Sequence, residues 1–447
     1  MTLPELLPSL RSSLPPHLDP DIWPLTAQEG QRGEVLVGGV ALSKIAEKYG
    51  TPTYVLDETD IRQRCRDYRA AFPEAEVAYA SKALLCRAVA GWVREEGLSL
   101  DVCSAGEIAV AAAAGFPAWR MVLHGNAKTP QDLRAALDYH VGRIVIDSVG
   151  EIAQLAANVH RRQRVLLRLT PGVDAETHTA LTTATEEQKF GLSLTSGAAA
   201  DAARRVLGQP KLNLVGVHCH LGSQIARFGG YEQAVQRLVA FMAWLRDECH
   251  TTLEELDIGG GHAVPYVSGD NGFALDAFAG RIRRVLHVEC DRYHLPLPRI
   301  TIEPGRAIVA RAGVTLYRVI AIKRTAGGQR LIAIDGGMSD NLRPCLYGAS
   351  YTARLVGRPL TADMEPTTVV GRHCEAGDVV ARNVPLPIDA HPGDVLAVPC
   401  SGAYHHSLAS NYNLVGRPPI IAVRDGSART LIRCETTEDL LARDIGL

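Results

Sequence analysis

Lys82 is the residue of this 447-residue chain that is best suited to covalent chemistry. The sequence holds seven lysines in all, and Lys82 comes directly after a short apolar run, Glu76–Ala80. A lysine that is held at a strand end and partly removed from water has a lowered pKa and can form a Schiff base with a carbonyl compound. A surface lysine at a strand end would give the same pattern, so the spacing alone leaves both interpretations open.

Two glycine-containing segments have the composition of an anion site. Gly259–Gly261 follows one apolar run, and Glu303–Arg306 follows the next. Glycines let backbone N–H groups approach and wrap an anion. A tight turn would explain three glycines on their own, but Gly305 in the neighbouring segment favours phosphate binding. Ser223 could add a hydroxyl group to such a site.

A carboxylate and two histidines fall at similar positions. Glu303 beside a pyridine nitrogen would keep that nitrogen protonated, although by itself it reads more simply as a partner of Arg306. His218 and His220 lie on one face of a predicted strand. A metal would need a third and a fourth ligand, and no other local cluster supplies them at metal spacing, so we expect no metal. We interpret His218 as a hydrogen-bonded core residue and His220 as a ring that stacks on a cofactor.

The last third of the chain adds a thiol and further polar groups. Cys374 and Glu375 are adjacent, and together they could supply an acid and a carboxylate that binds a cation. Arg343, Tyr347 and Tyr404 flank other turns of the same region. Each of these residues would be interpreted as a surface residue if it stood alone.

Eight apolar, β-branched runs, each followed by a stretch with helical spacing, must position these groups. This repeat predicts a closed (β/α)8 barrel, whose active site lies at the C-terminal ends of the strands, where the polar segments fall. A doubly wound open sheet is the alternative, but no G-x-G-x-x-G turn follows the first run. The eight runs are Glu76–Ala80, Ser99–Cys103, Met121–His124, Ile144–Asp147, Val165–Leu169, Leu214–His218, Leu256–Ile258 and Arg299–Ile302.

A second domain follows the barrel. After Arg306 the sequence changes to short strand-like runs that are split by Gly, Pro and Asp turns, which predicts a β-rich barrel or sandwich. We therefore expect an N-terminal segment (1–50) that joins the β domain, a barrel (51–307) and a C-terminal β domain (308–447). The expected strands of the β domain are Val314–Ile322, Leu331–Ile334, Val395–Val398, Pro419–Val423 and Thr430–Arg433.

Composition excludes several classes of partner. A net charge of -2 gives no reason to expect nucleic acid or an acidic membrane, and no apolar run is long enough to span a bilayer. The N-terminal residues through Pro24 lack a basic start followed by an apolar core, so we expect no signal peptide. Ten cysteines without a C-x-x-C pair are typical of reduced thiols, which predicts a cytoplasmic protein.

Several separated motifs, in order, resemble those of diaminopimelate decarboxylases, which are pyridoxal-phosphate (PLP) enzymes with an alanine-racemase-like fold. The resemblance runs from about Gly50 to Arg417, and the ordered set is far more specific than any one motif. The motifs are YASKA (Tyr79–Ala83), DVCSAGE (Asp101–Glu107), HGN (His124–Asn126), LTPGV (Leu169–Val173), QKFGLSL (Gln188–Leu194), HCHLGSQ (His218–Gln224), DIGGG (Asp257–Gly261), EPGR (Glu303–Arg306), DGGMSDNLRPCLYGA (Asp335–Ala349), HCEAGD (His373–Asp378) and SGAYHHSLASNYN (Ser401–Asn413).

The resemblance implies roles for the residues around the cofactor. Lys82 would form the Schiff base, His220 would stack on the ring, and Glu303 would meet the pyridine nitrogen. Cys374 would be the acid that returns a proton to Cα. The residues implied near the phosphate are Ser223, Gly259, Gly260, Gly261, Gly305 and Tyr404.

The resemblance also implies the substrate, meso-diaminopimelate, and the product, L-lysine. The distal carboxylate of the substrate would meet Arg306, Arg343 and Tyr347, with Tyr404 nearby, and its distal ammonium would meet Glu375. The Cys-Glu loop of this family comes from the neighbouring subunit, which implies a homodimer with two shared sites.

Three alternatives stay open. The first is a related decarboxylase that acts on ornithine, arginine or a carrier-bound substrate, which need not keep the full set of substrate residues. The second is a silent PLP-binding or regulatory homologue, which should have lost Lys82 or Cys374; both residues are present. The third is a racemase, which Glu303 disfavours because the resemblance places an arginine at that position in alanine racemase.

Overall fold

The computed structural model describes residues 18–173, 188–359 and 363–446. Its chain forms two compact units. Of these described residues, one unit holds those between 61 and 264 and between 271 and 309, and the other holds residues 18–60, 265–270 and those from Ala310 onward. The absence of a signal peptide was expected mainly from residues before Leu18, which lie outside the described part.

The first unit is the predicted barrel. Within the described residues, eight parallel strands pair in a ring, which closes through the pairing of β8 with β9. All eight predicted runs are confirmed as strands, to within a few residues at their ends. The strands are β5 (Glu76–Ala80), β6 (Ser99–Val102), β7 (Met121–Leu123), β8 (Arg143–Ile146), β9 (Gln163–Thr170), β11 (Leu212–His218), β12 (Glu255–Asp257) and β13 (Arg299–Ile302).

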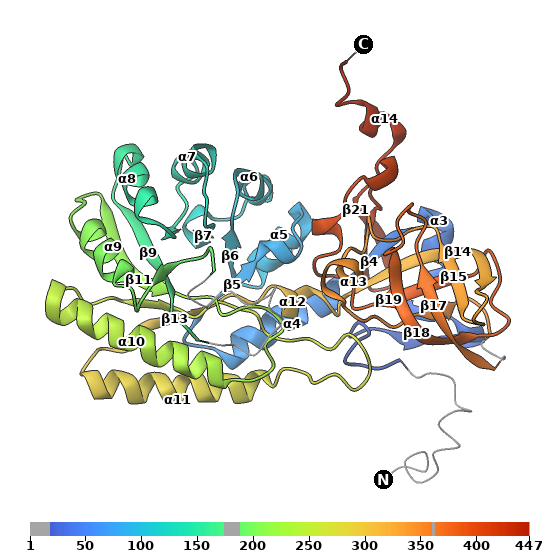
Figure 1. The fold of residues 1–447 in the computed structure, drawn as a ribbon, viewed down its shortest axis with the longest axis horizontal. Coiled ribbons are helices and arrows are strands. Elements are labelled where there is room, and N and C mark those ends of the chain that lie inside the picture. The colour runs from blue at the N-terminus through green and yellow to red at the C-terminus, as the bar shows by residue number, and fades with distance from the viewer. Residues whose placement is uncertain (1–17, 174–187, 360–362, 447) are drawn as a thin grey trace, which may run out of the picture. The chain divides into compact units, whose positions relative to one another are not determined.

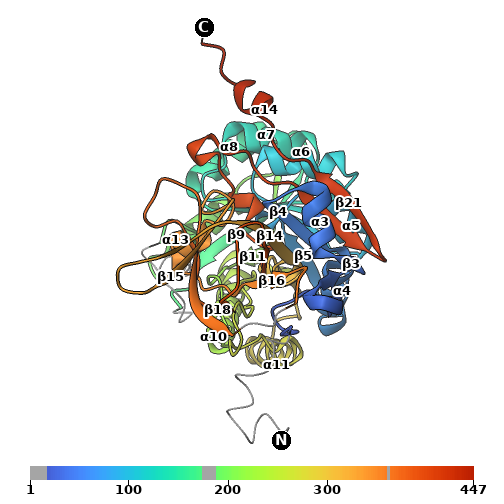
Figure 2. The same cartoon turned by 90° about the vertical axis from the view of Figure 1, so that its right-hand side faces the viewer.

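Helices cover the outside of this ring. Figure 1 shows α6 to α9 along the strands, and Figure 2 shows α4 to α8, α10 and α11 arranged around them. Because the strands are covered outside and packed inside, they are buried on both faces and read as continuous apolar runs. The helices are α4 (Glu58–Ala71), α5 (Arg87–Glu95), α6 (Ala105–Ala113), α7 (Pro130–Asp138), α8 (Val149–Asn158), α9 (Ala198–Leu207), α10 (Gly229–Cys249), α11 (Leu275–Tyr293) and the short α12 (Arg306–Val309).

Branched side chains fill the interior of the barrel. Val122, Val145, Leu166 and Val215 come from four strands and form one buried cluster. Such layers make the centre of a (β/α)8 barrel a packed core rather than a pore, so polar side chains gather at its ends. Any pocket for chemistry therefore has to lie at the rim.

The DVCSAGE motif (Asp101–Glu107) contains the N-terminal cap of a helix. Ser104 caps the N-terminus of α6, since its hydroxyl accepts from the N–H of Glu107 at 3.2 Å. The Glu107 carboxylate in turn accepts from the N–H of Cys103 at 2.6 Å. Both hydrogen bonds satisfy backbone N–H groups around the first turn, so these polar residues fix where the helix begins.

The second unit is β-rich, as predicted. Its main sheet has the order β18-β17-β15-β14-β4-β20-β21, and β14 also pairs with β19, which pairs with β16. Strands β17 and β18 were not predicted, because Pro366 and Pro385, which face each other across the pair, argue against strands. The strands are β4 (Thr53–Asp57), β14 (Gly313–Arg324), β15 (Arg330–Ile334), β16 (Arg354–Val356), β17 (Met364–Val370), β18 (Val379–Pro387), β19 (Val395–Pro399), β20 (Ile420–Arg424) and β21 (Ser427–Ile432).

The N-terminal boundary differs from the expected one. Strand β4 was placed with the barrel, but it pairs with β14 and β20 of the second sheet. The described residues before it form a small three-stranded sheet and helix α3 in the same unit. These elements are β1 (Gln28–Glu29), β2 (Val35–Val37), β3 (Val40–Ala41) and α3 (Leu42–Tyr49).

Two short helices complete the second unit, α13 (Arg343–Tyr347) and α14 (Thr437–Leu441). Among all the helices in the described part of the chain, none combines the length and the apolar character needed to cross a bilayer.

Candidate active site

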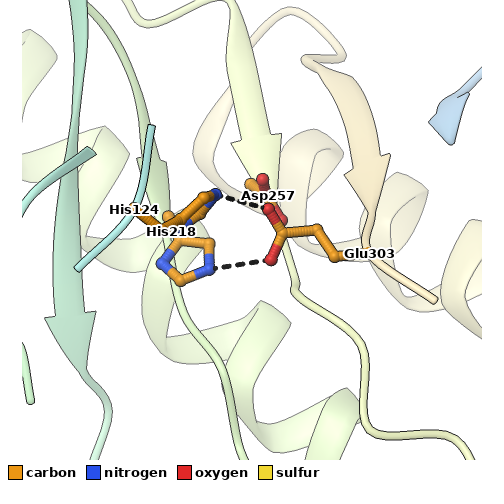
Figure 3. A group of neighbouring side chains, drawn as sticks. All are labelled: His124, His218, Asp257 and Glu303. Carbon is orange, nitrogen blue, oxygen red and sulfur yellow. Dashed lines mark hydrogen bonds and ion pairs between the residues drawn. The ribbon is translucent and has the colours of Figure 1, made fainter. Parts of the chain in front are cut away.

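Glu303 belongs to a buried group of four side chains at the C-terminal ends of barrel strands (Figure 3). His218 ends β11 and Asp257 ends β12, while His124 follows β7 and Glu303 follows β13. His124 Nε2 lies 2.7 Å from Glu303 Oε1, and His218 Nε2 lies 3.3 Å from Glu303 Oε2. Because the parallel strands of a barrel end at one rim, residues that are far apart in the sequence meet here.

The two histidines decide the charge of Glu303. Burial alone would raise the pKa of this carboxyl, but its contacts with His124 and His218 hold the pKa well below the ordinary value. Burial also lowers the pKa of His218 to about 3, so this ring is neutral at ordinary pH and can donate its Nε2–H to the carboxylate. Glu303 is therefore a fixed negative charge at the rim of the barrel.

A second acid lies beside Glu303. Burial and the neighbouring Glu303 raise the pKa of Asp257 well above its ordinary value. Its Oδ1 atom accepts a hydrogen bond from the N–H of Gly259 at 2.8 Å. Asp101, at the end of β6, has its pKa raised to about 6, chiefly by burial, although His124 opposes this shift.

The geometry corrects one argument made from the sequence. His218 was expected to lack further groups of the kind that bind metals, but potential ligand atoms of His124, His218, Asp257 and Glu303 all lie within 4.8 Å of one another. Local spacing did not reveal this group, because each residue comes from a different strand. In the structure Glu303 is paired with both histidines.

Lys82 lies at the same rim. It occupies a single 3-10 turn, Ser81–Ala83, directly after β5, and it is exposed while both of its neighbours in that turn are buried. Its positive charge acts on Asp101 and His220, so these groups share one electrostatic environment. An exposed amine beside a buried cluster of polar groups can react with a molecule bound there.

Lys128 is a second lysine at this end of the barrel, and its amine could in principle react in place of that of Lys82. Its side chain is fully buried, and its Nζ lies 2.7 Å from Glu151 Oε1 and 2.8 Å from the carbonyl oxygen of Gly125. Burial lowers its pKa, and Glu151 opposes that shift. The Lys128 amine is thus held in an ion pair inside the protein, whereas the Lys82 side chain is exposed at the rim.

His220 lies against the predicted glycine segment. Its Nδ1 accepts from the N–H of Gly260 at 3.3 Å, and burial, aided by Lys82, lowers its pKa well below the ordinary value. The ring is therefore neutral, with its remaining N–H at Nε2. A Cβ atom on Gly260 would lie 1.9 Å from the carbonyl oxygen of Glu303, so only glycine allows this approach. The neighbours Gly259 and Gly261 have positive φ angles of 69° and 97°.

Ser223 and Arg306 are brought together. The guanidinium of Arg306 is buried, and its Nη2 donates to Ser223 Oγ at 2.8 Å. Gly305 lies against β5, where an added Cβ would come within 3.0 Å of Ala80 Cβ. A hydroxyl and a buried cation beside the glycine segment are groups that bind an oxyanion.

Arg343 and Tyr347 lie together in the second unit. Both are in helix α13, and the guanidinium carbon of Arg343 is 5.8 Å from the centre of the Tyr347 ring. Arg343 is 3% exposed and donates to the hydroxyl of Tyr266 at 3.2 Å, and its guanidinium carbon lies over that ring, 4.8 Å from the centre. The guanidinium thus lies near two aromatic rings, and arginine is the side chain that recognises a carboxylate in a bidentate way.

The Cys374–Glu375 pair projects from a firmly held loop. Both residues are exposed, whereas His373 before them and Asp378 after them are buried. His373 Nε2 is 2.8 Å from Ser339 Oγ, and Asp378 accepts from the N–H of His373 at 2.8 Å. Tyr404 is half-buried in another loop of this unit, at a positive φ of 61°.

The structure thus brings the barrel residues Lys82, His220 and Glu303 to one rim. The candidates for the phosphate site belong to the same unit, except Tyr404. The other unit holds Arg343, Tyr347, Cys374, Glu375 and Tyr404. Reasoning from the sequence missed His124, His218 and Asp257 as members of the Glu303 group. The available signal was their position, since each lies at or directly after the end of a predicted strand.

Known proteins match this chain over its whole length. Residues 58–310 match the family model of the pyridoxal binding domain of pyridoxal-dependent decarboxylases. The diaminopimelate decarboxylase of Actinosynnema pretiosum subsp. auranticum is 57% identical and covers 100% of both chains. Among solved structures, diaminopimelate decarboxylase from M. jannaschii in complex with L-lysine is 31% identical and superposes with a TM-score of 0.88 over 94% of this chain and 98% of that one.

A second solved structure is more distant. The lysine/ornithine decarboxylase of Vibrio vulnificus in complex with cadaverine is 26% identical, with a TM-score of 0.75 over 86% of this chain and 97% of that one. Its identity and coverage are lower than those of the two diaminopimelate decarboxylases above. The chain belongs to the diaminopimelate decarboxylase family of pyridoxal-dependent decarboxylases.

Proposed function

We propose that this protein uses PLP to decarboxylate meso-2,6-diaminopimelate to L-lysine and CO2, the last step of lysine biosynthesis. Identity of 57% over the full length with a diaminopimelate decarboxylase supports the substrate. The observation that carries the chemistry is the buried Glu303 carboxylate, which two histidines keep ionised at the rim where Lys82 is exposed.

The residues present fit the cofactor. Glu303 Oε1 is buried and lies within ion-pair distance of His124, but no hydrogen bond of good geometry reaches it, so it can accept from a pyridinium N–H. Glycines and Ser223 with Arg306 are suited to a phosphate group. PLP, when bound, supplies an aldehyde that condenses with amines and a ring that accepts the electron pair left behind by CO2.

Each barrel residue has one task in this proposal. Lys82 provides the amine that holds the cofactor and that the substrate amine replaces. Glu303 keeps a proton on the ring nitrogen, which favours decarboxylation over racemisation. His220 presents a neutral imidazole face to the ring, because burial and Lys82 disfavour its charged form. The phosphate group is assigned to Ser223, Gly259, Gly260, Gly261 and Gly305, with Tyr404 near it.

The distal end of the substrate carries a carboxylate and an ammonium, and both need partners. We assign the carboxylate to Arg306, Arg343 and Tyr347, since a guanidinium binds a carboxylate through two parallel hydrogen bonds. The contacts of Arg343 with Tyr266 support this assignment, because a hydrogen bond and a cation–π contact restrain the guanidinium. We assign the ammonium to Glu375, and we place Tyr404 beside the substrate.

Cys374 is proposed to return a proton to Cα after CO2 has left. Its exposure at the tip of an anchored loop supports a role in a neighbouring subunit, so we propose a homodimer with two shared sites. All ten cysteines are free thiols, which is consistent with the cytoplasm as the proposed location.

Complementation between variants tests the shared site. Lys82→Ala and Cys374→Ala should each be inactive alone, because each removes a required group. Mixed in one preparation, they should regain up to about a quarter of wild-type activity, since a random mixture contains hybrid dimers with one intact site. Two inactive variants that stay inactive in demonstrated hybrid dimers would refute the shared site.

The reaction itself is tested with purified protein, PLP and meso-diaminopimelate. CO2 and L-lysine should appear in equal amounts. A racemised substrate without CO2 release would support the racemase instead, and no reaction in a protein that binds PLP would support the silent homologue.

A further inference from the structure

Asp257 connects Glu303 with the glycine segment. Its Oδ1 accepts from the N–H of Gly259 at 2.8 Å, two residues further along the chain. The carbonyl oxygen of Gly259 in turn accepts from the N–H of Glu303 at 2.8 Å. The end of β12 is thus joined to the residue that follows β13 through both the backbone and the Asp257 side chain.

Asp257 and Glu303 are two carboxyl groups side by side in a buried site. Asp257 is 2% exposed and Glu303 is 5% exposed. Two carboxylates this close cannot both ionise cheaply without water, so one of them keeps a proton. His124 and His218 both contact Glu303, which places the negative charge on Glu303 and the proton on Asp257. The opposite shifts in their pKa values agree with this assignment.

We propose that Asp257 is a positioning residue that acts as a neutral acid, donating a hydrogen bond to Glu303 while it accepts one from Gly259. This inference rests on the PLP-dependent function proposed above and deepens it. Asp257 would set the distance between the carboxylate that meets the cofactor ring and the glycines that face its phosphate. Its contribution is to hold the site in shape before the cofactor arrives.

An isosteric substitution separates this role from the alternatives. In Asp257→Asn the amide nitrogen can donate to Glu303 and the amide oxygen can accept from Gly259, so both hydrogen bonds are kept without an ionisable group. Asp257→Ala removes both. The affinity of the purified apoprotein for PLP, followed by absorbance without any substrate, is the readout, so the result does not depend on which amino acid is decarboxylated.

We expect Asp257→Asn to retain PLP affinity within about threefold and Asp257→Ala to lose about tenfold or more, the usual effect of removing a hydrogen bond to a charged group. Asp257→Asn should also keep the visible absorption band of the wild-type holoenzyme. If Asp257→Asn is as damaging as Asp257→Ala, the group acts as an ionised carboxylate and the proposal is wrong. Unchanged affinity in Asp257→Ala would also overturn it.

Asp147 offers a matched control. It is likewise a buried aspartate at the C-terminal end of a barrel strand, and its Oδ1 accepts from the N–H of Gly191 at 2.9 Å. Asp147→Ala should lower thermal stability but leave PLP affinity within about threefold, since its carboxyl lies outside the Glu303 group. If both alanine variants lose PLP affinity equally, the effect of Asp257→Ala comes from a general destabilisation of the barrel. The proposed positioning role of Asp257 would then be wrong.

Discussion

His124 Nε2 lies 2.7 Å from Glu303 Oε1 in the buried rim of the barrel. Together with His218 on the other carboxylate oxygen, this contact holds the pKa of Glu303 well below its ordinary value, despite burial. A carboxylate that is ionised before the cofactor binds can keep a proton on the ring nitrogen throughout the reaction. The contact forms because His124 follows β7 and Glu303 follows β13, and both strands end at the same rim of the barrel.

Glu303→Gln should therefore bind PLP but turn over slowly. The amide cannot hold a positive charge on the ring nitrogen, so the ring accepts electrons less well. We expect turnover to fall on the order of a hundredfold or more, which corresponds to ~3 kcal/mol of transition-state stabilisation. Steady-state kinetics with PLP saturating provides the check, and near-normal turnover would exclude the proposed role.

Lys82→Ala should abolish the covalent link to PLP while leaving the fold intact, because its side chain is exposed at the rim. Borohydride reduction of the wild-type holoenzyme, followed by peptide mapping, should place the pyridoxyl label on Lys82. The buried Lys128 is the internal control and should stay unlabelled, since Glu151 and two carbonyl groups hold its amine. A label on any lysine other than Lys82 contradicts the assignment.

The barrel could be predicted because its strands are buried and most carry a run of apolar side chains, as Ile144–Ile146 does in β8. Strand β4 could not be assigned, since its partners β14 and β20 lie far along the chain and local pattern carries no pairing information. The same limit applies to the site. Glu303 and His218 stood out individually, but their contact with each other depends on closure of the barrel.

Arg343→Ala should impair turnover of meso-diaminopimelate severely while PLP still binds. The guanidinium is buried beside the Tyr266 ring, and its loss would leave the distal carboxylate of the substrate without this partner, at a cost of roughly 2–5 kcal/mol. Glu375→Ala should act in the same direction through the distal ammonium. Steady-state kinetics of both variants, beside PLP titration, measures the effect.

Arg433→Ala is the control for Arg343→Ala. Arg433 is 66% exposed and forms an ion pair with Asp439. Its loss should change turnover by less than twofold or so, as for most surface pairs. Normal turnover in both Arg343→Ala and Glu375→Ala would show that these residues do not bind the distal end of the substrate as assigned.

Asp340 predicts a pH dependence of stability in the second unit. Burial raises its pKa to about 7, although it accepts hydrogen bonds from Tyr317 and from the N–H of Gly337. Because the folded state binds this proton more tightly than the unfolded state, the group stabilises the fold most at low pH. That contribution is lost as the pH rises toward 7.

Between about pH 5 and about pH 8 this group should lower the free energy of unfolding by roughly 2–3 kcal/mol. In Asp340→Asn that component should vanish, which urea unfolding at both pH values would detect. An unchanged pH dependence in the variant would show that another group is responsible.

Comparison of kcat/KM across amino acids tests the central claim most directly. Purified wild-type protein with PLP is given meso-diaminopimelate, L-lysine, L-ornithine and L-arginine in turn, and CO2 and the amine product are measured. We predict that meso-diaminopimelate yields L-lysine and exceeds each of the others by at least about a hundredfold, since only it carries the distal carboxylate. Faster decarboxylation of ornithine, arginine or lysine would contradict the assignment of the substrate.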